Sequence, residues 1–334
     1  MQAASGGRSR HAVRPAPPIP SPSIAPSQEL GHKRRMPLLS EWDDPSLERR
    51  LPGPSRATRL ARNLRVARRI VLILGWTALS CVVQSAMLIL PGRGKVVFAA
   101  CYWSVVSRLM GMRVRVLGKP AGQAPRSERR PVIYVCNHSS WIDVPVLGGK
   151  LHACFVAKEE VGGWPLVGTV ARLGRTLFVS RQRKATGRER DDMSLRLKAG
   201  DDLILFPEGT SSDGSRVLPF HSSFFAAAKG GATAEPPALG EIPLIQPVSV
   251  VYDQLGTLPV GRANRTVFSW YGDMDLAPHF IQLARWRGMR ASIWLHDPLD
   301  PVDFASRKAL SQAAWTAIAR GCGELRQNRA ERQA

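Results

Sequence analysis

Apolar residues follow two different patterns along this chain, and the first predicts membrane helices. Residues 70–90 are predominantly apolar and carry no charged side chain. At a rise of about 1.5 Å per residue, a helix of this length reaches roughly 30 Å, the thickness of the hydrocarbon core of a bilayer. Residues 96–112 predict a second apolar helix with Tyr102, Trp103 and one charge, Arg108, as expected of a helix at a membrane interface.

Arginines at helical spacing precede the first apolar stretch and favour a membrane helix over the alternative, a helix buried in a soluble core. They are Arg56, Arg59, Arg62, Arg65, Arg68 and Arg69. Such a basic collar is typical of the cytoplasmic side of a membrane. The two apolar segments fit either a single span or a hairpin that enters one leaflet and returns. We expect the hairpin, which keeps the rest of the chain on the cytoplasmic side.

The second pattern begins at residue 113, where short apolar runs alternate with helical segments. It predicts strands at 113–117, 132–136, 153–157, 176–179, 203–206, 244–251, 267–271 and 292–295. It predicts helices at 142–150, 164–173, 186–199, 221–230, 277–287 and 308–327. This alternation is typical of an α/β fold with a mostly parallel central sheet flanked by helices. The predicted fold is therefore α/β, preceded by an N-terminal membrane-associated two-helix segment.

The patterns divide the chain into four regions. Residues 1–55 form a Pro- and Arg-rich tail that buries too little apolar surface to fold. Residues 56–112 hold the basic collar and the two membrane helices, residues 113–327 the α/β domain, and residues 328–334 a frayed end. The tail is no secretory signal, because no apolar segment follows its first basic residues. We also expect translation to start at Met36, a hypothesis that N-terminal sequencing checks.

The net charge of the chain restricts the classes of partner that it is expected to bind. The 334 residues carry a net charge of +21, which favours nucleic acid, anionic lipid or a phosphorylated substrate as partner. No nucleic-acid motif is recognisable, so we expect anionic membrane lipid as a partner and no nucleic acid.

The five cysteines form no CxxC pair, which favours buried thiols in a reducing, cytoplasmic-facing compartment. None of the seven histidines has a partner at zinc-like spacing, so no metal is expected.

Candidate chemistry begins where the strand 132–136 ends, at Asn137-His138, with Asp143 five residues later. Open α/β sheets place ligands at this carboxyl edge. Five residues of continuous helix turn through about 500°, roughly 140° off one face, so the pair meets best with His138 in a loop and Asp143 in the first helical turn. The carboxylate can then hold one ring nitrogen and leave the other as a base. The alternative is that Asn137 or Ser139 simply caps a helix.

Two further strand ends carry polar residues. After the strand 203–206, Glu208-Gly209-Thr210 presents a carboxylate and backbone N–H groups that could hold an anion or a hydroxylated group. An ordinary turn is the alternative. Arg175 and Arg181 bracket the strand 176–179. They form either a phosphate clamp or a solvated basic face.

Together these stretches resemble the glycerolipid acyltransferase family typified by 1-acylglycerol-3-phosphate acyltransferase. Asn137, His138 and Asp143 match its block Asn-His-x-x-x-x-Asp. Residues 206–210 match Phe-Pro-Glu-Gly-Thr in full, and residues 174–181 match Gly-x-x-Phe-(Ile/Val)-x-Arg with one extra residue. The order and separation of the blocks also fit, and the resemblance covers about 113–300.

The chain departs from the family pattern in three places. Ser211-Ser212 stands where many members have an arginine, and residues 220–224 lack the common lysine and glycine. The block Val-Pro-x-x-Pro appears at 242–247 with its second proline one place late. These departures bear on the acceptor more than on the reaction.

The resemblance implies a general-base mechanism. His138 would remove the proton from an acceptor hydroxyl, which attacks the acyl thioester, while Asp143 holds the imidazole. Glu208, Gly209 and Thr210 would hold the polar part of the acceptor. Arg181, together with Lys158, would hold its phosphate. No cofactor is implied beyond acyl-CoA or acyl-carrier protein as co-substrate, which makes acyl-carrier protein a further expected partner.

The expected protein is thus an acyltransferase at the inner membrane, with its catalytic domain facing the cytoplasm, where acyl donors are made. Its leading acceptor is 1-acylglycerol 3-phosphate, giving phosphatidate. The alternative acceptor is another lyso-lipid such as lyso-ornithine lipid. A membrane ester hydrolase and a nonenzymatic basic module that binds membranes or nucleic acid are hypotheses of other classes.

Overall fold

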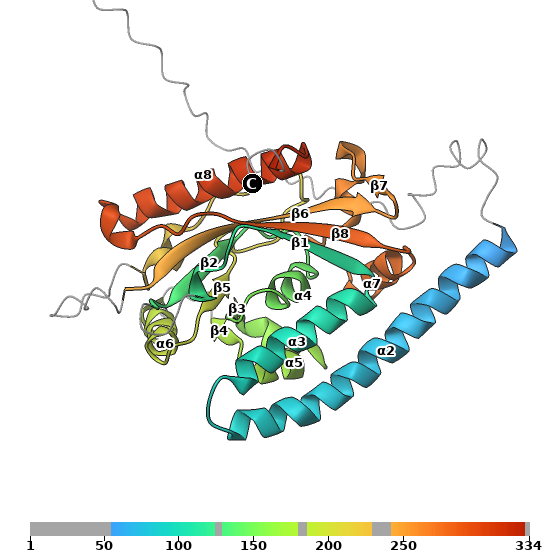
Figure 1. Ribbon diagram of the computed structural model, residues 1–334, viewed down its shortest axis with the longest axis horizontal. Helices are drawn as coiled ribbons and strands as arrows, with labels where there is room; N and C mark the ends of the chain where they lie inside the picture. The colour runs from blue at the N-terminus through green and yellow to red at the C-terminus, as the bar shows by residue number, and fades with distance from the viewer. Residues whose placement is uncertain (1–54, 124–128, 180–185, 229–241, 331–334) are drawn as a thin grey trace, which may run out of the picture. The chain divides into compact units, whose positions relative to one another are not determined.

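A single twisted sheet organises the protein. The computed structural model describes residues 55–123, 129–179, 186–228 and 242–330. Within them, eight strands form a sheet of order β1-β8-β6-β2-β5-β3-β4, with β7 paired to β6 (Figure 1). The strands are β1 Met112–Leu117, β2 Val132–Cys136, β3 Cys154–Lys158, β4 Leu177–Val179, β5 Leu203–Leu205, β6 Leu244–Leu255, β7 Leu258–Pro259 and β8 Met289–Leu295.

The sheet is mostly parallel, as predicted. Along its path only β6 and β8 pair antiparallel, and the short β7 also runs antiparallel to β6. All five residues of β2 are buried, because β2 lies between β5 and β6 and both faces of the sheet are covered. Buried parallel strands read as unbroken apolar runs, which is why the sequence located β2 to the residue.

Helices cover the sheet in two layers. They are α2 Arg56–Ile89, α3 Gly94–Leu109, α4 Asp143–Gly148, α5 Val167–Leu173, α6 Thr186–Lys198, α7 Leu276–Ala284 and α8 Arg307–Arg326. One apolar core joins the sheet to α4 and α7, with Met110 at the end of α3. The other joins it to α6 and α8. Figure 1 shows α8 on one side of the sheet and α3, α4 and α5 on the other.

Two predicted elements are wrong. Residues 267–271 are not a strand: the 3-10 helix η6, Arg262–Val267, leads into a loop in which the N–H groups of Phe268 and Ser269 bond back to Arg265 and Thr266. Phe268 is buried nonetheless, stacked on Tyr252 at 4.9 Å between ring centroids. The helix expected at 221–230 is only a 3-10 turn, Ser222–Phe225, as far as residue 228.

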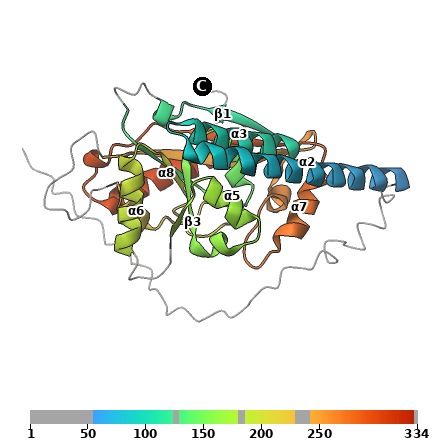
Figure 2. The ribbon, with the colours of Figure 1, turned by 90° about the horizontal axis from the view of Figure 1, so that it is seen from below.

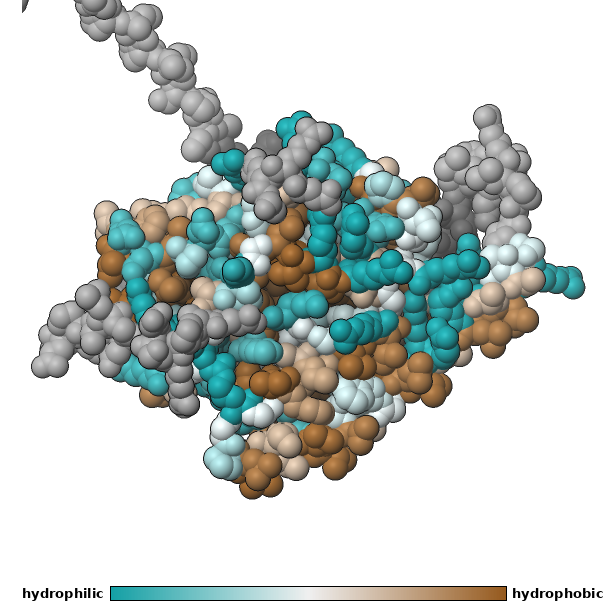
Figure 3. Space-filling view, viewed as in Figure 1, coloured by the Kyte–Doolittle hydropathy of each residue, from teal (hydrophilic) through white to brown (hydrophobic). Residues whose placement is uncertain are grey.

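The helix α2 continues without a break from the arginines through the apolar stretch, and its pattern of burial is reversed. The residues of α2 that are buried are Val66, Arg69, Thr77, Ser80 and Gln84. Large apolar side chains point outward instead, among them Val71 at 69% and Val82 at 71% exposure. Figure 3 shows apolar residues gathered where α2 and α3 lie in Figure 1.

Polar contacts fasten α2 to the domain along its length. In its first half, Nη1 of Arg69 donates to the carbonyls of Ala284 and Trp286, at 2.9 and 2.8 Å. Near its end, Nε2 of Gln84 donates to the carbonyls of Lys95 and Leu173, at 3.0 and 2.9 Å. Figure 2 shows α2 and α3 side by side across one face of the domain. Residues 55–334 accordingly cluster as one compact unit.

These contacts bear on the predicted membrane segment. Among the described residues, α2 is the one helix long and apolar enough to cross a membrane, and only 17% of its most apolar window is buried. A core helix of a soluble domain would be mostly buried, so that alternative is wrong. Residues 1–54 of the predicted tail and residues 331–334 of the predicted frayed end lie outside the described residues.

Candidate active site

Two neighbouring strand ends bring the predicted stretches together. β2 and β5 run parallel, with Val135 opposite Leu205, so the loops that follow them leave from the same edge of the sheet. There the backbone N–H of His138 donates to Oε1 of Glu208 at 2.7 Å. The Asn-His stretch and the Pro-Glu-Gly stretch therefore build one site, although 70 positions separate these two residues.

His138 and Asp143 form the predicted pair. Nδ1 of His138 lies 2.8 Å from Oδ2 of Asp143, with His138 in the loop and Asp143 at the first position of α4. The same oxygen accepts the N–H groups of Ser139 and Ser140 at 2.8 and 2.9 Å. A carboxylate that accepts from Nδ1–H fixes the tautomer in which Nε2 keeps its lone pair. The imidazole side chain is 20% exposed, so a substrate can reach this base.

Tyr252 completes the support of Asp143 and was not predicted from the sequence. It lies on β6 and is buried, and its hydroxyl donates to Oδ1 of Asp143. Burial, and then the negative charge of Asp143, raises the pKa of Tyr252 well above its usual range. The phenol therefore stays protonated and can act only as a donor to the carboxylate. A tyrosine in a buried run needs such a partner, but the sequence does not say which.

Glu208 is bound to the main chain on both of its oxygens. Oε1 accepts from His138, and Oε2 accepts from the N–H of Leu218 at 2.9 Å. Burial raises the pKa of the Glu208 carboxyl to about 7, against the two backbone bonds, which lower it. Only 3% of the residue is exposed. In this structure Glu208 holds the His138 loop, and the contact to the acceptor that the resemblance implies stays a prediction.

Three more residues restrain the loop. The amide of Asn137 exchanges two hydrogen bonds with the backbone of Val250, at 3.0 and 2.8 Å. The N–H and the hydroxyl of Ser212 both donate to the carbonyl of His138. The ring of Phe206 stacks on the imidazole at 4.1 Å between centroids. The orientation of His138 is thus determined by β6, the loop after β5 and α4 together.

The remaining predicted site residues lie around this centre. Gly209 has a φ of +68° and lies close to the ring of His221, a backbone conformation that favours glycine. Thr210 is exposed. Lys158 ends β3, half-buried and opposite Val179 of β4. Arg181 lies outside the described residues.

The other arginine of the predicted phosphate clamp has a different role. Nη1 of Arg175 donates to Oδ1 of Asp201 at 2.8 Å, and Nη2 binds the second oxygen of the same carboxylate. Arg175 is therefore held in a bidentate ion pair, and Asp201 neutralises its charge within the protein.

Among the described residues, no group of three His, Cys, Asp or Glu side chains could hold a metal ion.

The chain is similar in sequence to known acyltransferases. Residues 119–251 match the family model described as Acyltransferase. The chain is 36% identical over 209 residues to the lyso-ornithine lipid O-acyltransferase of Rhizobium meliloti (strain 1021), which covers 62% of this chain and 68% of that protein. It is 28% identical over 137 residues to the 1-acyl-sn-glycerol-3-phosphate acyltransferase of Neisseria gonorrhoeae, covering 41% of this chain and 51% of that protein.

A solved structure shares the fold. The crystal structure of the 1-acyl-sn-glycerophosphate acyltransferase PlsC from Thermotoga maritima aligns with a TM-score of 0.57 at 21% identity, covering 80% of this chain and 97% of that one. At this identity the likeness shows the α/β fold alone. The sequence relatives carry the assignment further, since one of them is 36% identical over two thirds of its length. The chain belongs to the glycerolipid acyltransferase family and is an acyltransferase of the lysophospholipid type.

Proposed function

We propose that this enzyme transfers an acyl chain from an acyl thioester to the free hydroxyl of lyso-ornithine lipid. The observation that carries the proposal is that relatives named for this acceptor have higher sequence identity and coverage than relatives named for 1-acylglycerol 3-phosphate. Four proteins named lyso-ornithine lipid O-acyltransferase are 32–37% identical over 59–65% of this chain. Two named 1-acyl-sn-glycerol-3-phosphate acyltransferase are 28–29% identical over 34–41% of it.

The local geometry supports a general-base mechanism. Nε2 of His138 takes the proton of the acceptor hydroxyl as that oxygen attacks the thioester carbonyl. Asp143 stabilises the imidazolium that forms, and Tyr252 and the two backbone N–H groups hold Asp143. When the tetrahedral intermediate collapses, the C–S bond breaks and the proton passes from Nε2 to the departing thiolate. The acyl chain never becomes attached to the enzyme.

The surroundings of the base favour a lipid acceptor over water. Phe206 stacks on the imidazole, and Phe155 stacks on Phe206 at 6.4 Å between centroids. This apolar wall suits an acyl chain near the reacting hydroxyl. 1-Acylglycerol 3-phosphate stays the second candidate acceptor, favoured by the full match of residues 206–210 to Phe-Pro-Glu-Gly-Thr.

The proposed place of action is the cytoplasmic face of the inner membrane. The exposed apolar side chains of α2 would enter one leaflet, while its arginines meet anionic headgroups. Because α2 is bonded to the domain at Arg69, in its first half, and again at Gln84, near its end, it lies along the domain between these points rather than leading away from it. This supports a helical hairpin in one leaflet over a single span.

The experiment is an acyl-transfer assay on purified full-length protein in detergent. It compares kcat/KM for lyso-ornithine lipid, 1-acylglycerol 3-phosphate and other lyso-lipids, each with acyl-CoA and with acyl-carrier protein as donor. We expect the highest kcat/KM with lyso-ornithine lipid, and no turnover of any acceptor by His138→Ala. A higher value with 1-acylglycerol 3-phosphate would reject the proposed acceptor. Release of free fatty acid without an acceptor would instead point to the hydrolase.

A further inference from the structure

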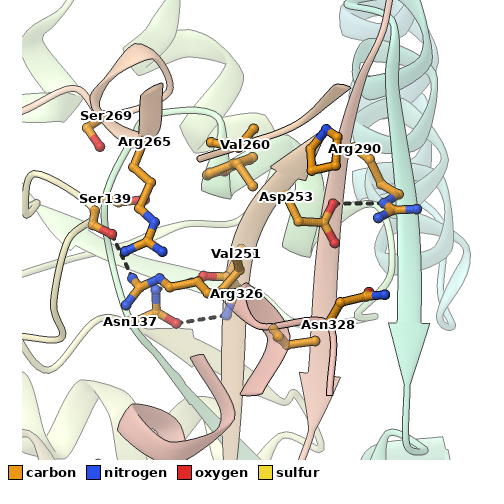
Figure 4. A pocket seen from close by; sticks show the side chains of 15 residues that line it. Asn137, Ser139, Val251, Asp253, Val260, Arg265, Ser269, Arg290, Arg326 and Asn328 are labelled. Atoms are coloured by element: carbon orange, nitrogen blue, oxygen red, sulfur yellow. Dashed lines mark hydrogen bonds and ion pairs between the residues drawn. The ribbon is translucent and has the colours of Figure 1, made fainter. Parts of the chain in front are cut away.

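A cavity of about 170 Å³ lies beside the catalytic loop (Figure 4). Asn137 and Ser139, the two neighbours of His138, line it, but His138 does not. The other walls come from η6 and the loop after it, the end of β6 and the end of α8. Tyr252, which holds Asp143, also lines it, but no residue that the mechanism places in contact with the reacting groups does.

The residues that line the cavity carry more positive than negative charge, three arginines against the one carboxylate of Asp253. Arg265 and Arg326 line it, and Figure 4 shows both guanidinium groups on the same side as Asn137 and Ser139. The lining carboxylate, Asp253, already binds Arg290 at 2.8 Å, as well as the hydroxyl of Ser292.

The two arginines differ in their partners. Arg326 donates to the carbonyls of Gly214 and Ser215 at 2.7 and 3.1 Å. Arg265 has no side-chain hydrogen bond or ion pair to any described residue. Burial, and next the proximity of Arg326, lowers the pKa of Arg265. Two like charges held at one end of a cavity favour a shared anion.

An unsatisfied hydroxyl lines the same cavity. Ser269 is 1% exposed, and its Oγ has no hydrogen-bond partner among the described residues. Burying such a group without a partner is costly. Gly214 lies so close that an added Cβ would stand 2.7 Å from this oxygen. A ligand that accepts a hydrogen bond from Ser269 would remove the penalty.

We propose that the cavity binds an oxyanion of the phosphate class, held by the guanidinium groups of Arg265 and Arg326 and by the hydroxyl of Ser269. The planar fork of arginine suits phosphate oxygens, and donors converging from η6, α8 and the loop after η6 suit a tetrahedral ion. Bound there, the anion joins these elements beside the catalytic loop. The site is independent of which lipid is the acceptor. Free phosphate, the phosphate groups of coenzyme A and the phosphate of a phosphorylated lipid all offer the same oxygens to these donors, and the probes below distinguish them.

The test is thermal unfolding of the full-length protein in detergent and phosphate-free buffer, with sodium chloride at matched ionic strength as the control. Inorganic phosphate should raise the Tm of the wild type saturably. Arg265→Gln should lose the rise. Arg262→Gln, a change at an exposed arginine of the same 3-10 helix, should keep it. An equal rise in Arg265→Gln, or no rise in the wild type with any probe below, overturns the proposal.

Ser269→Ala is a second variant that tests the site even if Arg265→Gln loses its response to phosphate through a folding defect. Because its hydroxyl lacks a partner, this variant should be at least as stable as the wild type without phosphate, and should respond less to phosphate. A full response would remove Ser269 from the site and count against the proposal. Coenzyme A and 1-oleoylglycerol 3-phosphate below its micellar concentration serve as the other probes. The probe with the lowest Kd in the wild type, lost in Arg265→Gln, identifies the source of the phosphate.

Discussion

The carboxylate of Asp143 accepts hydrogen bonds from His138, Ser139, Ser140 and Tyr252. It is fully buried, so each of these donors offsets part of the cost of keeping a charge away from water. The backbone donors come from the same short loop as the histidine. Tyr252 comes from another strand, and it is the donor that a single substitution can remove.

Replacing Tyr252 with Phe should lower kcat roughly 10-fold, because one hydrogen bond to a charged group is lost, while its stacking on Phe268 is kept. KM should change little, since the ring does not contact the acceptor. The assay is steady-state acyl transfer with the preferred acceptor. Tyr134→Phe is the matched control: it also removes a buried hydroxyl in the same apolar core, one that accepts from the N–H of Gly122 and does not contact Asp143. Equal kcat in the two variants would assign Tyr252 a purely structural role.

The raised pKa of Glu208 predicts that the stability of the protein depends on pH. Its pKa is about 7 in the folded protein, against about 4.3 for an unfolded chain. Between these values the folded state retains a proton that the unfolded state has released, so the free energy of unfolding falls as pH rises through this window. The loss is about 1.4 kcal/mol per pH unit at most, and it levels off above pH 7.

Glu208→Gln cannot titrate, so the Tm of the wild type should fall relative to that of this variant between pH 5 and pH 7. The difference between the two proteins cancels the other titrating groups. Thermal unfolding in one detergent across that range measures it. A constant difference in Tm would show that Glu208 titrates near its ordinary pKa in the folded protein.

The sequence could predict the parts of the site that are local. His138, Asp143 and Glu208 each follow or begin an element whose apolar pattern is clear, and parallel strands end at one edge. It could not predict Tyr252 as the partner of Asp143, because 109 positions separate them. Nor could it predict that both oxygens of Glu208 bind backbone N–H groups, since the N–H of Leu218 is offered by an irregular loop.

At the scale of elements, buried strands were located well and irregular segments were not. Residues 267–271 have the composition of a strand, and Phe268 is as buried as a strand residue. The segment nevertheless leaves the 3-10 helix η6 with its N–H groups already bonded, so it offers no ladder to a neighbour. Apolar composition records burial, and burial alone does not distinguish a strand from a packed loop.

The reversed burial of α2 depends on polar residues that reach carbonyls at helix ends. Arg69 meets carbonyls at the end of α7, and Gln84 meets that of Leu173 at the end of α5. Such carbonyls lack partners within their own helix, and a guanidinium there also complements the helix dipole. The contacts explain why a helix with the composition of a membrane span lies flush against the domain.

At the scale of the whole molecule, the exposed side of α2 should govern membrane binding. Replacing Val71, Leu79 and Val82 with Glu places charges on an apolar face where these residues are 69, 56 and 71% exposed. Binding to vesicles that contain anionic lipid should fall by at least about 10-fold, because three apolar side chains no longer enter the bilayer. Flotation with vesicles measures the change.

The matched control places glutamates on α8, on the opposite side of the sheet. It replaces three exposed residues of that helix, Ala309, Gln312 and Thr316. They add the same charge and should leave vesicle binding nearly unchanged. Equal losses in the two triple variants would mean that overall charge, rather than the α2 surface, decides membrane binding.

The reversed burial of α2 also changes which of its positions should tolerate substitution. In a water-soluble domain, the apolar positions of a helix are the demanding ones and its polar positions are freely exchanged. With α2 in the membrane position proposed above, its outward apolar residues would meet only fluid lipid tails, so leucine, valine and isoleucine should substitute for one another there. The demanding positions are Arg69, Thr77 and Gln84, whose bonds require particular shapes. Substitution of these residues by leucine would raise the hydropathy of the helix and weaken its attachment to the enzyme.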